Sequence, residues 1–324
     1  MNLTIAPSHQ AGNLTRGQRR RLRLFELGSR ALEARYARLL DEQFGTPRPP
    51  AYVCPLCFRV LGREAVLANA TSQTTAILTA EDVPPKSLGG RPLVLTCGPC
   101  NHSSGRRLDA NARAREHVRT LLYGKPAEPR PITLSIENTS VRGSYFVDEQ
   151  GNHVFRLAAE PAANRVGASS GFTTAVFGGA QPRAFQMRFM DQYHERFYQL
   201  SWLRTAYLAW FAVLGYPFIL DPALRKVREQ IVDPIKALLS GFLSEDSPER
   251  PLTDRVLFLV REPSELRSVG IRVGPYTVLL PRPGDLEFYS RVKNLPGKPI
   301  AFQADGLAWP YEPTFGQARP SDEA

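Results

Sequence analysis

The chain has 324 residues, of which 43% are hydrophobic and 22% charged, so it is long enough for two domains and apolar enough to bury a core. These values exclude a chain too polar to fold. The net charge of +10 makes nucleic acid the first partner to consider, because excess Lys and Arg attract polyanions. Residues 1–110 hold 15 Lys or Arg against 8 Asp or Glu, a net charge of +7, so most of the excess lies in this third of the chain.

The chain begins with MNLTIAPSHQ, which has no basic segment followed by an apolar run, so we expect no secretory signal. The most hydrophobic stretch, residues 202–220, carries Arg204 and is interrupted by Gly215 and Pro217. A charge and a helix break in so short a stretch predict a buried helix and not a membrane span. We therefore expect a cytoplasmic protein without a membrane partner.

The first expected element is a helix over residues 16–44, where apolar residues recur at helical spacing. An arginine cluster lies at its start and opposes the helix dipole: Arg19, Arg20, Arg21 and Arg23. Two interpretations of this cluster stay open, a solvated amphipathic face or an arm that contacts phosphates. The Pro-rich segment GTPRPP then ends the helix.

All four cysteines fall into two Cys-x-x-Cys pairs separated by 39 residues: Cys54 with Cys57, and Cys97 with Cys100. Without secretion, paired thiols suit a metal better than disulfides, although free core cysteines are an alternative. A redox dithiol is less favoured, because no thioredoxin-like βαβ pattern surrounds either pair. Four thiolates suit one tetrahedral Zn(II), and four protein ligands leave no open position for substrate. The pattern therefore predicts a structural zinc.

The segment EDVPPKSLGG, followed by LVLTCGPCN and LDA, resembles the HNH endonucleases of the ββα-metal type with zinc knuckles. In that family one strand carries an acidic residue followed by the general base. A second strand runs into Cys-x-x-Cys, and a His or Asn after the last cysteine opens a helix. The resemblance, over about residues 54–110, implies that Glu81 and Asn101 bind one catalytic divalent ion. Such oxygen ligands suit Mg(II) or Mn(II).

The general base is where the chain departs from the family, because the usual His is replaced by Asp82. No Asn lies between Gly90 and Cys97 to orient a base. A carboxylate is a weaker base than imidazole, and loss of a general base slows hydrolysis by about 10²–10⁴-fold. Asp82 is alternatively a further metal ligand. His102 is an alternative base, but one residue past Asn101 on a helix its side chain points about 100° away.

Four basic residues flank the implied site, where a phosphate backbone would pass: Lys86, Arg91, Arg106 and Arg107. A solvated basic face is the alternative interpretation. Asp109 follows them, and we expect it to pair with Arg106 on the helix surface.

The rest of the chain has strand and helix patterns without a βαβ rhythm, which predicts an α+β fold. We expect helices over residues 111–124 and, in pieces, over 193–239, the second packed into the core by its aromatic residues. A linker is expected at 125–131, and loops at 168–172 and 177–182. Strands are expected at 132–136, 143–148, 153–157, 255–260, 276–280 and 286–290.

The sequence thus predicts an N-terminal basic helix (1–50), an HNH-like zinc module (51–124), an α+β domain of unknown role (125–315) and a disordered tail (316–324). The implied activity is hydrolysis of DNA phosphodiester bonds with one divalent metal ion, with Glu81, Asp82 and Asn101 as the catalytic residues. The alternative is a catalytically inactive, zinc-containing nucleic-acid-binding or interaction module, motivated by the missing base His.

Overall fold

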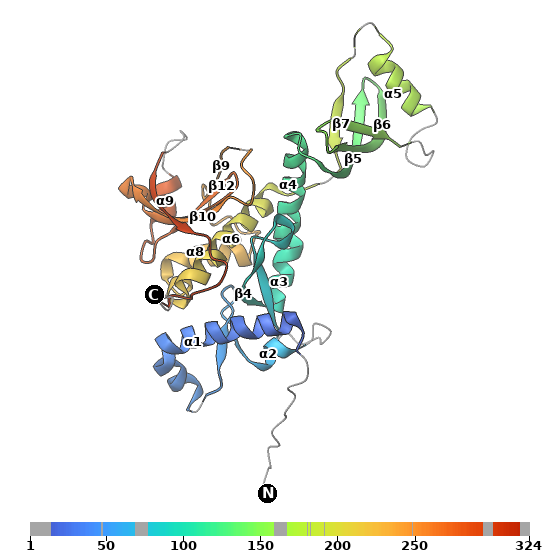
Figure 1. Cartoon of the computed structure of the whole chain (residues 1–324). Coiled ribbons are helices and arrows are strands. Elements are labelled where there is room, and N and C mark those ends of the chain that lie inside the picture. Colours follow the sequence, from blue (N-terminus) through green and yellow to red (C-terminus); the bar gives the residue numbers. More distant parts are fainter. Residues whose placement is uncertain are drawn as a thin grey trace, which may run out of the picture. The chain divides into compact units, whose positions relative to one another are not determined.

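The computed structural model describes residues 14–46, 48–68, 77–158, 167–179, 181, 183–190, 192–247, 249–293 and 301–317 (Figure 1). Its helices and strands confirm the predicted α+β class. The chain forms two compact units. The larger unit comprises Met1–Arg106 and Trp202–Ala324, and the smaller unit comprises Arg107–Ser201. From residue 318 onward, the tail expected at 316–324 lies outside the described residues.

These compact units group the chain differently from the parts expected from the sequence. Residues after Trp202 return to the unit that holds the cysteines, because buried side chains of this later segment bond to the cysteine-bearing loops. The boundaries at 50, 124 and 315 stay a prediction about functional modules.

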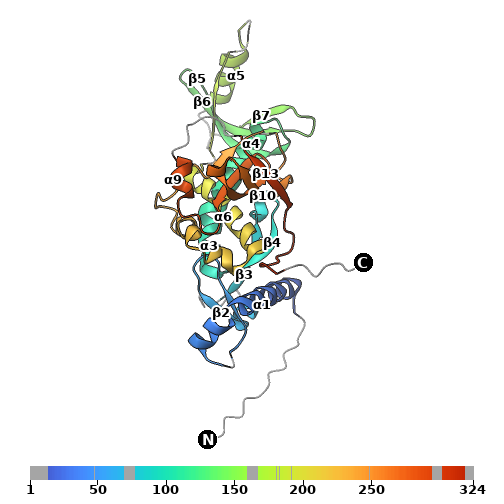
Figure 2. The ribbon, with the colours of Figure 1, turned by 90° about the vertical axis from the view of Figure 1, so that its left-hand side faces the viewer.

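The first helix, α1 (Arg16–Phe44), has the bounds expected from the sequence. It begins with a capping box, in which the Gln18 N–H donates to Thr15 Oγ1 at 3.2 Å and the Thr15 N–H donates to Gln18 Oε1 at 2.9 Å. Buried residues such as Phe25 and Leu32 turn one side of α1 toward the interior. The helix lies against β1 (Ala51–Val53) and against the hairpin of residues 78–97. Figure 2 shows the helix beside that hairpin.

That hairpin consists of β3 (Leu78–Val83) and β4 (Arg91–Cys97), which pair antiparallel with a bulge between Glu81 and Asp82. Their loop contains the short 3₁₀-helix η1 (Lys86–Leu88), which ends at Gly89 in a left-handed conformation, and then Gly90. A Cβ on Gly90 would lie 1.5 Å from the Pro84 carbonyl oxygen, so no other residue fits without moving the backbone.

The helix α3 (Gly98–Ser104) follows β4 directly, so the segment has a ββα arrangement. A π-helical turn, η2 (Gly105–Asp109), connects α3 to α4 (Ala110–Leu122). The remaining small elements of this region are β2 (Val60–Gly62), which pairs with β1, and α2 (Glu64–Leu67).

The core of the larger unit is built around α6 (Glu195–Leu214), in which every residue from 202 to 212 is buried. Trp202 stacks on Tyr276 with ring centroids 4.4 Å apart, and Trp210 Nε1 donates to the Gly270 carbonyl at 3.0 Å. The expected core role of these aromatic residues is confirmed. Within the described ranges, no helix combines the length and apolarity that crossing a bilayer requires.

A five-stranded antiparallel sheet packs beside α6, in the order β13-β10-β11-β12-β9. Its strands are β9 (Leu243–Glu245), β10 (Arg255–Glu262), β11 (Ser268–Val273), β12 (Tyr276–Pro281) and β13 (Gln303–Ala308). The helical elements after α6 are α7 (Tyr216–Ile219), η3 (Pro222–Leu224), α8 (Arg225–Val232), η4 (Ser264–Leu266) and α9 (Phe288–Lys293).

The smaller unit contains a four-stranded antiparallel sheet in the order β7-β6-β5-β8, with α5 (Ala168–Phe177) against it (Figure 1). Its strands are β5 (Ala127–Ile136), β6 (Thr139–Val147), β7 (His153–Leu157) and β8 (Gln186–Phe189). Phe172 and Val176 of α5 are buried on the apolar face of this sheet.

Three local predictions were wrong. Residues 168–172, expected as a loop, begin α5, because Phe172 and Val176 are one helical turn apart and both reach the core. Residues 286–290, expected as a strand, lead into α9, where buried Phe288 and core-packed Val292 have the same spacing. The expected linker at 125–131 enters β5 at Ala127.

Candidate metal centre

The first cysteine pair lies in the tight turn between β1 and β2. The Cys54 N–H donates to the Arg59 carbonyl at 3.0 Å, and the Phe58 N–H donates to the Cys54 carbonyl at 2.9 Å. Phe58 closes the turn with φ of +59°, a left-handed conformation. This backbone geometry directs the sulfurs of Cys54 and Cys57 to one side.

The second pair lies where β4 becomes α3. Cys97 ends the strand and caps the helix, and Cys100 lies in the first helical turn. The Cys97 N–H donates to Cys54 Sγ at 3.3 Å, so the two pairs already share a hydrogen bond. The Gly98 N–H donates to the Ile77 carbonyl at 2.8 Å, which fixes the start of α3 beside β3.

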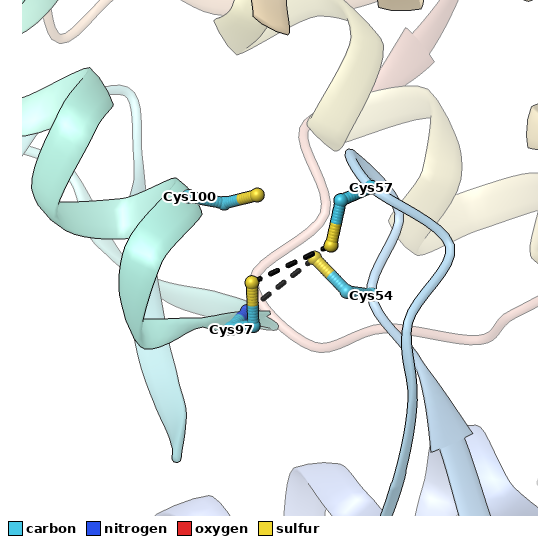
Figure 3. Close-up of side chains that lie close together, drawn as sticks. All are labelled: Cys54, Cys57, Cys97 and Cys100. Atoms are coloured by element: carbon cyan, nitrogen blue, oxygen red, sulfur yellow. Dashed lines mark hydrogen bonds between the residues drawn. The ribbon is translucent and has the colours of Figure 1, made fainter. Parts of the chain in front are cut away.

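All four sulfur atoms point into one cluster (Figure 3) and lie within 4.8 Å of one another. Cys57 Sγ and Cys97 Sγ are 3.5 Å apart. A Zn(II) ion with Zn–S bonds of about 2.3 Å would separate its sulfurs by about 3.8 Å, so the spacing and the soft donors both fit zinc. The four cysteines are therefore positioned to hold a metal ion, consistent with a structural zinc.

Protons are unevenly shared within this cluster. Hydrogen bonding with Cys100 lowers the pKa of Cys97 to about 7 and lowers the pKa of Cys57 further. Hydrogen bonds to Cys54, Cys57 and Cys97 raise the pKa of Cys100, which therefore holds its proton more tightly than a free cysteine does. Because zinc binds thiolates, metal binding must displace this proton and is favoured as pH rises.

Side chains from α6, α7 and α8 hold the cysteine loops in place. The Tyr207 hydroxyl donates to the Pro55 carbonyl at 2.9 Å, and the Val53 N–H donates to the Tyr216 hydroxyl at 3.2 Å. Burial raises the pKa of both tyrosines, so they remain neutral. The Arg228 guanidinium lies 4.2 Å from the centre of the Phe58 ring. This cation–π contact supports the turn that holds Cys54 and Cys57.

The carboxylate of Glu81, one of the two implied ligands of a catalytic ion, lies in the core of the larger unit. Its side chain is 4% exposed and forms an ion pair with Arg204 of α6, whose side chain is 2% exposed. The Thr96 hydroxyl donates to Glu81 Oε2 at 3.0 Å. Both carboxylate oxygens therefore contact protein donors.

The second implied ligand, Asn101, is one helical turn into α3 and also contacts the hairpin. Asn101 Nδ2 donates to Thr79 Oγ1 at 2.9 Å, and Thr79 Oγ1 donates to the Thr96 carbonyl at 3.1 Å. Glu81 is part of β3, and Asn101 bonds to Thr79, two residues earlier on the same strand. The two implied ligands therefore lie at the same strand pair. The contacts described here for both side chains are to protein groups.

The proposed base and the flanking residues lie nearer the surface. Asp82 is half-buried on the far side of the bulge from Glu81, opposite Pro92. The four basic residues, Lys86, Arg91, Arg106 and Arg107, are exposed, as is His102. Asp109, expected beside Arg106, accepts a hydrogen bond from the Ser201 hydroxyl at 3.0 Å.

A basic groove, not expected from the sequence, lies between α1 and the hairpin, and we name it the arginine groove. It encloses about 380 Å³ and is lined by Arg19, Arg20, Arg23, Leu24, Leu27, Pro92, Tyr311, Glu312 and Pro313. Arg20 donates to the Pro92 carbonyl at 2.7 Å, which joins α1 to β4. Tyr311, 66% exposed, also borders an adjoining small pocket that contains Arg91 and Arg255.

No known protein family, curated protein or solved structure matches this chain in the comparisons made with it.

Proposed function

We propose that the protein binds nucleic acid through an HNH-like ββα module stabilised by a structural zinc, and that it does not cleave the nucleic acid. The observation that carries this proposal is the buried ion pair of Glu81 and Arg204. A catalytic divalent ion on Glu81 would lie beside a guanidinium that already compensates the carboxylate, and the two cations would repel each other. The missing base His supports the same conclusion.

The arginine groove supports the binding half of the proposal. Three arginines gather along its wall, and exposed Tyr311 connects it to the pocket of Arg91 and Arg255. One carboxylate, Glu312, lines the groove and pairs with Arg23 at 2.7 Å. A row of guanidinium groups on one side of the β3–β4 hairpin suits a phosphate backbone. Of the two interpretations of the arginine cluster at the start of α1, the proposal therefore takes the arm that contacts phosphates.

Salt-dependent binding of a duplex DNA oligonucleotide tests this surface. The double variant Arg20→Gln/Arg91→Gln, which we call the groove variant, removes one charge from the arginine groove and one from the adjoining pocket. Arg35→Gln/Arg38→Gln is the matched control, because it removes two exposed arginines from the other end of α1. We expect the groove variant to lower the slope of log K against log salt by about 2, since each lost phosphate contact lowers it by about 0.9. Equal slopes for the two variants would contradict the proposal.

A second candidate function is the DNA endonuclease activity that the family resemblance implies. It is favoured by the order of Glu81, Asp82 and Asn101 on a ββα segment, with the two implied ligands meeting one strand pair. In this function Mg(II) or Mn(II) would stabilise the phosphate charge, while Asp82 takes the proton from the attacking water. Glu81 would have to leave Arg204 before it could bind the ion.

The Arg204→Met variant separates the two functions. If Arg204 alone keeps the ion away, Arg204→Met should bind Mn(II) through its Glu81 carboxylate, as measured by electron paramagnetic resonance. The double variant Glu81→Gln/Arg204→Met should not bind Mn(II). Wild-type protein that binds Mn(II) through Glu81 would instead favour the endonuclease. Asp82→His serves as a third form, because a restored imidazole raises cleavage only where the metal site works.

A further inference from the structure

The sheet of the smaller unit has α5 packed against one of its two faces. Ile132, Leu134 and Ile136 of β5 are buried beneath α5. The residues between them, Thr133 and Ser135, point to the opposite face and are half-buried. We call this opposite surface the open face.

Strand register gathers three arginines on the open face. Arg142 of β6 and Arg188 of β8 both pair with Thr133, one on each side of β5. Arg156 of β7 pairs with Ser144, which is two residues from Arg142 on β6 and so shares its face. All three arginines are exposed. The open face therefore carries a guanidinium group on each of three strands.

An aromatic ring and several hydroxyl groups lie among these arginines. Phe146 is two residues from Ser144 on the same face, half-buried, and Arg156 Cζ lies 5.4 Å from its ring centre. The hydroxyls of half-buried Ser135 and exposed Ser140 are 2.8 Å apart. Guanidinium, aromatic and hydroxyl groups on one face of a sheet match the phosphates, bases and sugars of a nucleic acid strand.

The four strands of this sheet carry more basic than acidic residues. Over their full bounds they contain four arginines and one acidic residue, Glu128 of β5. This excess of positive charge favours a polyanionic partner.

We propose that the open face is a second nucleic-acid-binding site, specific for single strands. The arginines would contact phosphates, while a base stacks on Phe146. A duplex keeps its bases stacked and out of reach of a half-buried ring on a sheet, whereas a single strand can present them. An acidic protein segment would match the charges but would leave the ring without a stacking partner, and the experiment includes it as a competitor.

This site does not depend on the arginine groove, because it lies in the other compact unit and uses different residues. The two proposals can therefore fail separately. The groove variant Arg20→Gln/Arg91→Gln, measured with the same probes, shows which surface a probe uses.

The test uses the full chain and fluorescent 12-nucleotide dT and rU strands, with anisotropy measured over a range of salt. Arg142→Gln, Arg156→Gln and Arg188→Gln are prepared singly and together. The matched control is Arg183→Gln, which removes an exposed arginine from the α5 side of the same unit, where the Arg183 N–H donates to the Val176 carbonyl at 2.9 Å.

Each substitution on the open face should lower the salt slope by about 0.7, and the triple variant by about 2, while Arg183→Gln leaves a single-strand slope unchanged. Phe146→Leu keeps an apolar group but removes the ring, and should weaken binding at least about fivefold with little change in slope. Binding of dT and rU alike indicates recognition without the 2′-hydroxyl, and a preference for rU indicates its use. Both outcomes support the site.

Unchanged slopes in the singles and the triple would overturn the proposal. So would a polyglutamate peptide that competes as well as an oligonucleotide of equal charge, since that result assigns the face to acidic proteins. Circular dichroism and thermal melting check that each variant is folded. Should the triple variant not fold, the exposed single substitutions carry the same test.

Discussion

The buried pair of Glu81 and Arg204 makes the most specific prediction about the larger unit. Arg204→Met leaves a carboxylate in the core without its cation, and Glu81→Gln leaves a guanidinium there without its anion. Both side chains are almost fully enclosed, at 4% and 2% exposure, so water cannot compensate the remaining charge.

Each single substitution should lower the free energy of unfolding by about 3–5 kcal/mol, the usual result of leaving one buried charge unpaired. The double variant Glu81→Gln/Arg204→Met removes both charges and should lie much closer to wild type. We therefore expect a coupling energy of at least about 3 kcal/mol between the two positions. The exposed pair of Arg23 and Glu312, 64% and 65% exposed, should give a coupling below about 1 kcal/mol.

The measurement is urea unfolding of all members of both cycles, followed by circular dichroism with zinc held in excess so that metal loss does not contribute. A coupling at Glu81 and Arg204 as small as that of the surface pair would refute the reasoning. Glu81 would then be solvated enough to remain available to a metal ion.

Three further predictions concern the cysteine centre and its supports. Metal analysis should find one zinc per chain, lost in Cys100→Ser, and chelator-induced unfolding should be faster at pH 6 than at pH 8, because protons compete with zinc for the Cys100 thiol, whose pKa is raised. Tyr207→Phe should lower the free energy of unfolding by about 1–3 kcal/mol in urea, since the buried Pro55 carbonyl loses its donor. Gly90→Ala should destabilise the protein more than Gly89→Ala by thermal melting, because its Cβ would meet the Pro84 carbonyl; equal melting temperatures would contradict this packing.

The cysteine spacing was sufficient to predict that the four cysteines come together. Two Cys-x-x-Cys pairs are typical of a four-thiolate metal site, and the structure brings all four sulfurs within 4.8 Å of one another. The helix over 16–44 was also predictable, since apolar periodicity is a local signal, and the two strands before the second cysteine pair follow the order that the family resemblance implies.

The partner of Glu81 could not be found in the same way. Arg204 lies 123 positions away, and the sequence indicated only that a charge interrupts an apolar helix. A lone arginine in a helix that is buried on all sides requires a buried anion. The sequence therefore indicated that Arg204 has an acidic partner but not which residue it is. The bond from Tyr207 to the first cysteine loop was hidden for the same reason, because it depends on the return of α6 to the larger unit.

The wrong predictions at 168–172 and 286–290 have one cause. Both segments have weak or misleading local preferences, Ser and Gly in the first and aromatic residues in the second. In each segment, two apolar side chains four residues apart are directed to the protein interior, and this tertiary packing stabilises the helical conformation. Local propensity alone cannot contain that information.

One measurement tests the proposed function most directly: incubation of supercoiled plasmid with Mn(II) and enough wild-type protein to shift it fully on a gel, beside Glu81→Gln. We predict a complete shift by both proteins and no nicked circles after the protein is removed. Nicking by wild type that disappears in Glu81→Gln would contradict this, because it would mean that Glu81 leaves Arg204 to bind a catalytic ion.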